Sequence, residues 1–335
     1  MKYGLHASGA AGDALKSTLE RRLQGLDDLY SGNSHIPILH SKRFGPVPAI
    51  ETLSDYFELA ELITEAGFGT VGWRGHADSE WRVDSGLFRV AVKTLGLSGT
   101  DIPLENHEKL ARIMDLNERK MLNAVRLNRI GSERAPNLTD LEIMAMLQHF
   151  GAATRLVDFT RNAAIALWFA CREEPEKDGL VFSITMGGGL CGEIDSYEKS
   201  RESINEILSS SDCRLVAWAP SHLYERMRMQ QSLFLISLNQ ISSWGSISPE
   251  PFGYVNQYFR AFNAIGVPKA AKPHILLHLS SILGLRPETL FPDVEGFARA
   301  YGISHVKPLV ADGLDVDIGD DGTLSVFLSS KPNGK

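Results

Sequence analysis

Hydrophobic and polar positions alternate with helical spacing along much of this chain. One apolar repeat begins at Leu53, with positions three and four residues apart, and stops at Gly67. A second helix is expected over 104–128, where an apolar stripe runs beside a face rich in arginine and lysine. Thr139 and Glu142 have the spacing of a capping box, which predicts a third helix ending near Phe150.

A fourth helix should be buried, because the segment NAAIALWFAC is apolar nearly all round. Thr160 stands before it and is expected to cap it. Strands are predicted at 70–75, 179–185, 213–220 and 230–238, and the two Asp-Gly pairs in 311–335 indicate a hairpin. The remaining expected elements are a helix over 15–30, an extended connector over 35–50, and helices near 198–209, 253–263, 273–283 and 293–301.

These elements predict an α+β fold, a mixed α/β single core domain around a central, mostly antiparallel sheet. The core domain is expected over 51–305. An N-terminal helix and connector would occupy 1–50, and an acidic tail or hairpin would occupy 306–335.

Composition and charge narrow the functional classes. The 335 residues carry a net charge of −7, so no global basic field attracts nucleic acid, although a local basic groove is open. Three cysteines without a Cys-x-x-Cys spacing speak against a disulfide framework and against zinc, and we predict no metal site. With no signal peptide and no membrane-length apolar stretch in view, the expected compartment is the cytoplasm, without a membrane partner.

The first candidate site is the segment GWRGHADSEWRVDSGLFR, residues 72–89. Arg74 ends a predicted strand, and its guanidinium suits a phosphate or carboxylate because it donates two parallel hydrogen bonds. Gly75 would let a ligand approach the backbone, and His76 follows it. The alternative is that Arg74 pairs with a buried carboxylate, either Asp84 or Asp158.

The second candidate is HFGAATRLVDFT, residues 149–160, in which ionisable groups stand among apolar ones. Buried charges must be paired or must face a cleft. Arg155 and Asp158 could therefore form a structural ion pair. Alternatively the segment lines a pocket, with Arg155 or His149 facing a ligand.

A third candidate comes from YERMRMQQSLFL, residues 224–235. Gln230 and Gln231 stand at the start of a predicted strand. Their side-chain amides could recognise a base or ribose through hydrogen bonds, or they could form hydrogen bonds with the unpaired groups at the edge of the strand.

Four blocks of this sequence resemble the FRG (Phe-Arg-Gly) domain family. GWRGHADSEWRVDSGLFR resembles the motif that names the family, with Trp73 where Phe or Tyr is usual. QHFGAATRLVDFTRNAAIALWFAC resembles its second motif, and RMRMQQSLFL resembles a third element, with Ser232 in place of glycine. LGLRPETLFPDVEGFARA is similar to its closing segment. The blocks are in family order and span about 50–300.

The resemblance implies a bacterial or phage-borne protein in a toxin or antiphage defence setting. The order of parts is also similar to that of ADP-ribosyltransferases, which hold NAD with an arginine on a first strand. By that resemblance Arg74 would grip the NAD phosphates, His76 or His149 would orient the ribose, and Asp158 would stabilise positive charge at the ribose carbon. Cofactor contacts would come from Arg74, Gly75, Thr154, Arg155, Gln230 and Gln231.

One part of the transferase pattern is missing, since the strand at 230–238 carries no Glu. Asp158, Asp293 or Glu295 could replace it. We therefore expect an ADP-ribosyltransferase-like protein acting on NAD and a macromolecular or nucleotide target, and whether it is an enzyme stays open. The alternatives are a non-catalytic module that binds a nucleotide or nucleic acid, and a regulator that recognises a protein partner or antitoxin.

Overall fold

The computed structural model divides the chain into two compact units, Met1–Leu285 and Arg286–Lys335. The described residues are 36–66, 70–97, 102, 104–130, 137–185, 191–194, 200, 202, 206–207, 215–220, 224–237, 246, 262–294, 298, 314–318 and 324–328. The helix expected over 15–30 lies outside these residues, as do most of those expected near 198–209, 253–263 and 293–301.

A seven-stranded sheet forms the centre of the first unit, with strands in the order β6-β7-β8-β4-β3-β5-β9. All neighbouring strands are antiparallel except β6 and β7, which are parallel. The expected mixed α/β fold with a mostly antiparallel sheet is therefore confirmed. The strands are β3 (Thr70–His76), β4 (Val157–Thr160), β5 (Gly179–Thr185), β6 (Cys191–Glu193), β7 (Leu215–Trp218), β8 (Ser232–Ser237) and β9 (Phe262–Val267).

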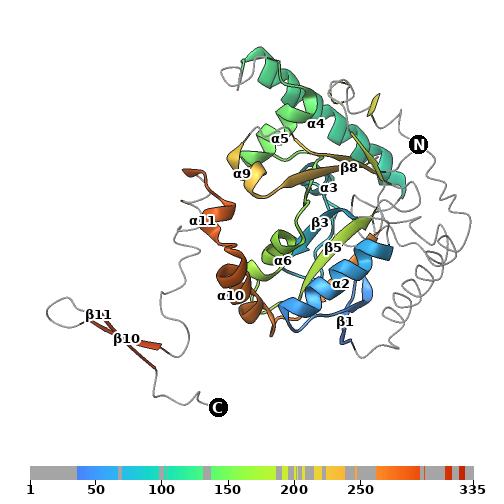
Figure 1. Ribbon diagram of the computed structural model, residues 1–335. Coiled ribbons are helices and arrows are strands. Elements are labelled where there is room, and N and C mark those ends of the chain that lie inside the picture. Colours follow the sequence, from blue (N-terminus) through green and yellow to red (C-terminus); the bar gives the residue numbers. More distant parts are fainter. Residues whose placement is uncertain are drawn as a thin grey trace, which may run out of the picture. The chain divides into compact units, whose positions relative to one another are not determined.

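Helices pack on this sheet in two groups (Figure 1). Helix α6 (Ala163–Arg172) packs on β3 and β5, α2 (Leu53–Ala66) packs on β9, and α10 (Lys272–Leu283) packs against both helices. Helix α5 (Asp140–His149) packs on the half formed by β7 and β8, and joins one apolar cluster with α4 (His107–Leu127) and α9 (Glu225–Met229). Helix α3 (Gly86–Thr94) packs against α4.

Several predicted elements agree with the structure. The helix beginning at Leu53 and the strand beginning at Thr70 are confirmed. The capping box of α5 is present, because the Thr139 hydroxyl accepts from the Glu142 N–H and the Glu142 carboxylate accepts from the Thr139 N–H. Helix α4 begins slightly later than expected, after a 3-10 turn at Leu104–Asn106.

Other predictions were wrong in detail. Helix α6 is capped by Asn162, whose side-chain oxygen accepts from the Ala164 and Ile165 N–H groups, and not by Thr160. Thr160 is the last residue of strand β4. The sequence did not predict this strand, because it has only four residues and a short apolar run. Phe262, expected near the end of a helix, begins strand β9, which is buried along its whole length.

Two smaller pairs of strands complete the structure. The expected connector holds β1 (Ile38–Ser41) and β2 (Gly45–Pro48), which pair antiparallel around a left-handed Gly45. The second unit holds the short helix α11 (Pro287–Leu290), β10 (Leu314–Ile318) and β11 (Leu324–Leu328). The last two strands pair antiparallel, which is the pairing that a hairpin makes.

The central sheet has an irregular seam between β3 and β4. These strands share a single paired position, Trp73 with Thr160. Beyond it, β3 continues to pair with β5 as far as His76, and β4 continues to pair with β8 as far back as Val157. The two strands therefore diverge beside Arg74 and Asp158, and the candidate site lies at this divergence.

Candidate functional site

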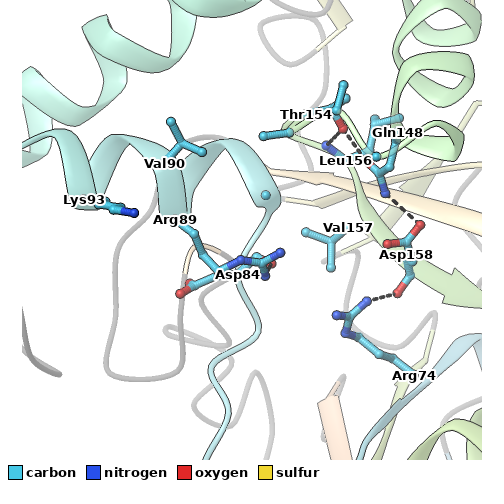
Figure 2. Close-up of a pocket in the computed structure, with 14 residues that line it drawn as sticks. Arg74, Asp84, Arg89, Val90, Lys93, Gln148, Thr154, Leu156, Val157 and Asp158 are labelled. Carbon is cyan, nitrogen blue, oxygen red and sulfur yellow. Dashed lines mark hydrogen bonds between the residues drawn. The ribbon is translucent and has the colours of Figure 1, made fainter. Parts of the chain in front are cut away.

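A pocket of about 420 Å³ opens where β3 and β4 diverge, which is within the size range of small-molecule sites. Its wall comes from the end of β3, from α3, from the end of α5 and from the chain that leads into β4 (Figure 2). The lining residues are Arg74, Asp84, Gly86, Arg89, Val90, Lys93, Gln148, Gly151, Ala152, Ala153, Thr154, Leu156, Val157 and Asp158. We call this cavity the Arg74 pocket.

Arg74 bridges the diverging strands. Its Nη1 donates to the backbone carbonyl of Asp158 at 2.5 Å, in place of the ladder hydrogen bond that the separated strands do not make (Figure 2). Its Nε donates to His76 Nε2 at 2.8 Å. Both of these partners are neutral groups, so the structure does not show the pairing of Arg74 with a buried carboxylate that was the alternative. Burial lowers the pKa of Arg74 and the nearby Asp158 raises it, but a guanidinium remains charged.

The Asp158 carboxylate is exposed at the pocket wall and is held by a short chain of side chains. Gln148 Nε2 donates to Asp158 Oδ1 at 2.7 Å, and the buried Thr154 hydroxyl donates to Gln148 Oε1 (Figure 2). Because the hydroxyl occupies the amide oxygen, the amide nitrogen must face the carboxylate. Thr154 and Gln148 thus orient an acid that water can reach.

Two further cations on α3 line the pocket. Arg89 and Lys93 are exposed and stand four residues apart on one helix face. Arg89 Nη1 donates to the backbone carbonyl of Asp84 at 3.0 Å. The Asp84 carboxylate is itself buried and engaged, since it accepts from the Ser246 N–H at 2.7 Å and lies 3.1 Å from Arg82 Nε. Burial raises the pKa of Asp84, and the cation Arg82 opposes this.

Arg155 was expected to face Asp158 or a ligand, and the structure places it elsewhere. Its Nε donates to Glu118 at 2.5 Å and its Nη2 donates to Asp115 at 2.6 Å, both on α4. The side chain is buried and is not among the pocket-lining residues. The Arg155–Asp158 ion pair, which was one of the two alternatives, is therefore wrong, and Arg155 instead ties the segment leading into β4 to α4.

Gly75 was expected to let a ligand approach the backbone, but the approaching group is helix α6. A Cβ at this position would overlap the Ala166 carbonyl oxygen and lie 2.6 Å from the Ala170 nitrogen. The missing side chain therefore serves the packing of α6 on β3, and this corrects its expected role in cofactor binding.

Four other predicted site residues lie outside the pocket lining. His76 is buried beneath Arg74, and the ring of His149 stacks on Tyr224 with a centroid distance of 4.5 Å. The backbone carbonyl of Gln230 accepts from the Thr160 hydroxyl, and that of Gln231 accepts from the Arg161 N–H. These two glutamines thus hold the junction between β4 and α6 through their main chain.

Three residues that line the pocket were given no role by the sequence, namely Gln148, Arg89, which ends the first candidate segment, and Lys93. The signal for the two cations was present, because Ser85 is a suitable N-cap and its hydroxyl accepts from the Phe88 N–H at the start of α3. Recognising that helix would have placed Arg89 and Lys93 on one face.

In the described part of the chain, no three or more His, Cys, Asp or Glu side chains gather closely enough to hold a metal ion. The helices described there include none with the length and apolar character that crossing a membrane requires.

The fold and the pocket define a mixed α/β protein whose antiparallel sheet carries a Trp-Arg-Gly segment at a cationic pocket. The family model of the FRG domain matches residues 69–179, a stretch that contains β3, β4, α6 and the whole lining of the Arg74 pocket. The chain therefore contains an FRG domain, as its motifs predict. Searches of curated proteins and of solved structures found no match.

Proposed function

We propose that the Arg74 pocket binds a nucleotide of the NAD class through its phosphates. The observation that carries this proposal is the convergence of three cations, Arg74, Arg89 and Lys93, on one pocket of a chain whose net charge is −7. Guanidinium and ammonium groups bind phosphate oxygens through charge-assisted hydrogen bonds. Arg74 is already fixed at Nε and Nη1, so its Nη2 edge would meet the ligand.

A second function, ADP-ribosyl transfer, is favoured by the exposed and oriented carboxylate of Asp158. In such a reaction the bond between the ribose C1′ and the nicotinamide nitrogen breaks, and nicotinamide leaves with the electron pair. Asp158 would stabilise the positive charge that develops at C1′. A nucleophile on a macromolecular or nucleotide target, or water, then bonds to C1′ and loses a proton. Action as a toxin or antiphage effector would follow from that chemistry and is proposed with it.

Ligand binding can be measured by the thermal shift of the full chain with NAD, ADP-ribose, ATP or a short single-stranded oligonucleotide. A ligand that binds only the folded state raises stability by RT ln(1 + [L]/Kd), which is about 2.7 kcal/mol at a concentration of 100 Kd. We expect a shift with NAD or ADP-ribose that disappears in Arg74→Ala. A shift with the oligonucleotide alone would support the nucleic-acid-binding alternative and contradict the nucleotide proposal.

The α3 cations give a second prediction. The double variant Arg89→Ala/Lys93→Ala should weaken NAD binding by roughly 100-fold or more, because two charge-assisted hydrogen bonds are lost and each is worth about 1.5–3 kcal/mol. The matched control is Arg119→Ala/Lys120→Ala, which removes the same charge from an exposed part of α4 outside the pocket lining. Equal losses in the two variants would show that only the general charge matters.

Asp158→Asn tests the chemistry separately. Asparagine keeps an acceptor oxygen for Gln148, and the replaced carboxylate is exposed, so stability should change by less than about 1 kcal/mol. Nicotinamide release from NAD should fall roughly 100-fold, since an electrostatic stabiliser at the reacting centre is worth that order. Release at the wild-type rate would remove Asp158 from the mechanism, and strong destabilisation would mean that it is a structural residue.

A further inference from the structure

The contact between Arg74 and His76 determines which nitrogen of the imidazole carries a proton. A guanidinium has only donors, so the 2.8 Å contact from Arg74 Nε requires a lone pair on His76 Nε2. A charged imidazolium has no such lone pair. His76 is therefore neutral in this arrangement, with its hydrogen on Nδ1.

The surroundings of His76 favour the neutral ring, and among the described residues the buried Nδ1 has no hydrogen-bond partner. The side chain is 2% exposed, and its ring meets Phe182 edge-on at 5.0 Å and Trp81 edge-on at 6.2 Å between centroids. Burial, followed by the cation of Arg74, holds the pKa of His76 well below its ordinary value. The backbone of Trp81 acts on this pKa in the opposite direction, and Arg89, a second nearby cation, lowers it further. The aromatic contacts fix the plane of the ring and so the direction of its lone pair.

We propose that His76 is a positioning residue, which accepts the Nε–H of Arg74 and holds the guanidinium across the seam between β3 and β4. With Nε bound to His76 and Nη1 bound to the Asp158 carbonyl, two atoms of the guanidinium are fixed to the sheet. Its plane is then set, and the remaining N–H groups of Nη1 and Nη2 form the edge offered to an anion. This role differs from the expected one, in which His76 itself contacts the ribose.

His76 would hold Arg74 in this way whether or not a ligand is bound. The expected effect on nucleotide affinity rests on the proposed function. Two variants separate position from packing. His76→Gln places an amide oxygen where Nε2 stood and so keeps an acceptor. His76→Leu keeps an apolar side chain against Phe182 and Trp81 and removes the acceptor.

The test is nitrogen-15 NMR of the full chain, labelled at histidine and arginine, without any ligand. We expect the His76 signals of a neutral ring protonated at Nδ1, and a slowly exchanging Nε–H of Arg74. Loss of the hydrogen bond in His76→Leu should speed that exchange about tenfold or more, and His76→Gln should keep it slow. A ring protonated at Nε2, a charged ring at neutral pH, or slow Arg74 exchange in His76→Leu would overturn the proposal.

Binding of NAD and ADP-ribose to the same variants gives the functional part. His76→Leu should weaken binding about tenfold while His76→Gln keeps most of the affinity, because a freed guanidinium must be ordered again by the ligand. Equal affinity of His76→Leu and wild type would overturn the positioning role. If wild-type protein binds neither probe, the proposed nucleotide function fails, and the ligand-free spectra still decide how Arg74 is held.

Discussion

Replacement of Arg155 by methionine is expected to lower the free energy of unfolding by about 3–5 kcal/mol, the range for breaking a buried ion pair. Arg155 is buried and contacts Glu118, which is also buried, and Asp115, which is 39% exposed. Methionine fills much of the same volume but leaves the Glu118 carboxylate without its cation. Burial already raises the pKa of Glu118, and Arg155 opposes that rise, so the uncompensated charge is the source of the loss.

Denaturant unfolding of a double-mutant cycle would measure this interaction. Glu118→Gln in the Arg155→Met background removes the buried carboxylate that has lost its cation, and it should recover most of the lost free energy of unfolding. Arg112→Ala, which breaks the exposed pair with Glu108 on the same helix, is the matched control and should cost no more than about 1 kcal/mol. Equal costs at Arg155 and Arg112 would mean that the buried pair is not structural.

Gly75→Ala is the second change with a large expected effect, a loss of about 3 kcal/mol or more. The new Cβ would meet the backbone of α6 at Ala166 and Ala170, and neither atom belongs to a side chain that could turn away. Helix α6 would have to move off β3, and overpacking of this kind usually costs about 1–3 kcal/mol even where side chains can yield.

Gly96→Ala is the comparison that isolates the steric cause. Gly96 has a left-handed φ of +64° and nothing within 4 Å of an added Cβ, so only backbone strain of about 1 kcal/mol should result. Both variants can be compared by their unfolding midpoints in denaturant. A smaller loss at Gly75 than at Gly96 would contradict the close packing of α6 on β3.

The sequence predicted those parts of the fold whose signals are local. Helix α2 follows from apolar spacing, and the start of α5 follows from Thr139 and Glu142, three residues apart. Strands β4 and β9 were missed because short apolar runs read equally well as parts of helices or loops. Their identity depends on partners far along the chain, such as β8 for β4 and β5 for β9.

The candidate site was likewise predicted where the signals are local and missed where they depend on distant residues. Arg74, Thr154 and Asp158, three of the predicted site residues, line one pocket, and they lie beside β3, α5 and α6, which were recognised in the sequence. Arg155 was misplaced because its partners, Asp115 and Glu118, are about 40 residues earlier on α4. No spacing rule within the segment 149–160 could have indicated them, since the choice between partners is made by tertiary packing.

The single pairing between β3 and β4 also has a mechanical consequence. Each half of the sheet, β6-β7-β8-β4 and β3-β5-β9, has a hydrogen-bond ladder of its own, and the halves share the Trp73–Thr160 position and the Arg74 crosslink. A hinge motion along this line would break fewer main-chain hydrogen bonds than one between any fully paired strands. An anion bound at the Nη2 edge would leave the contact between Arg74 and the Asp158 carbonyl in place, so an occupied pocket would oppose this hinge motion.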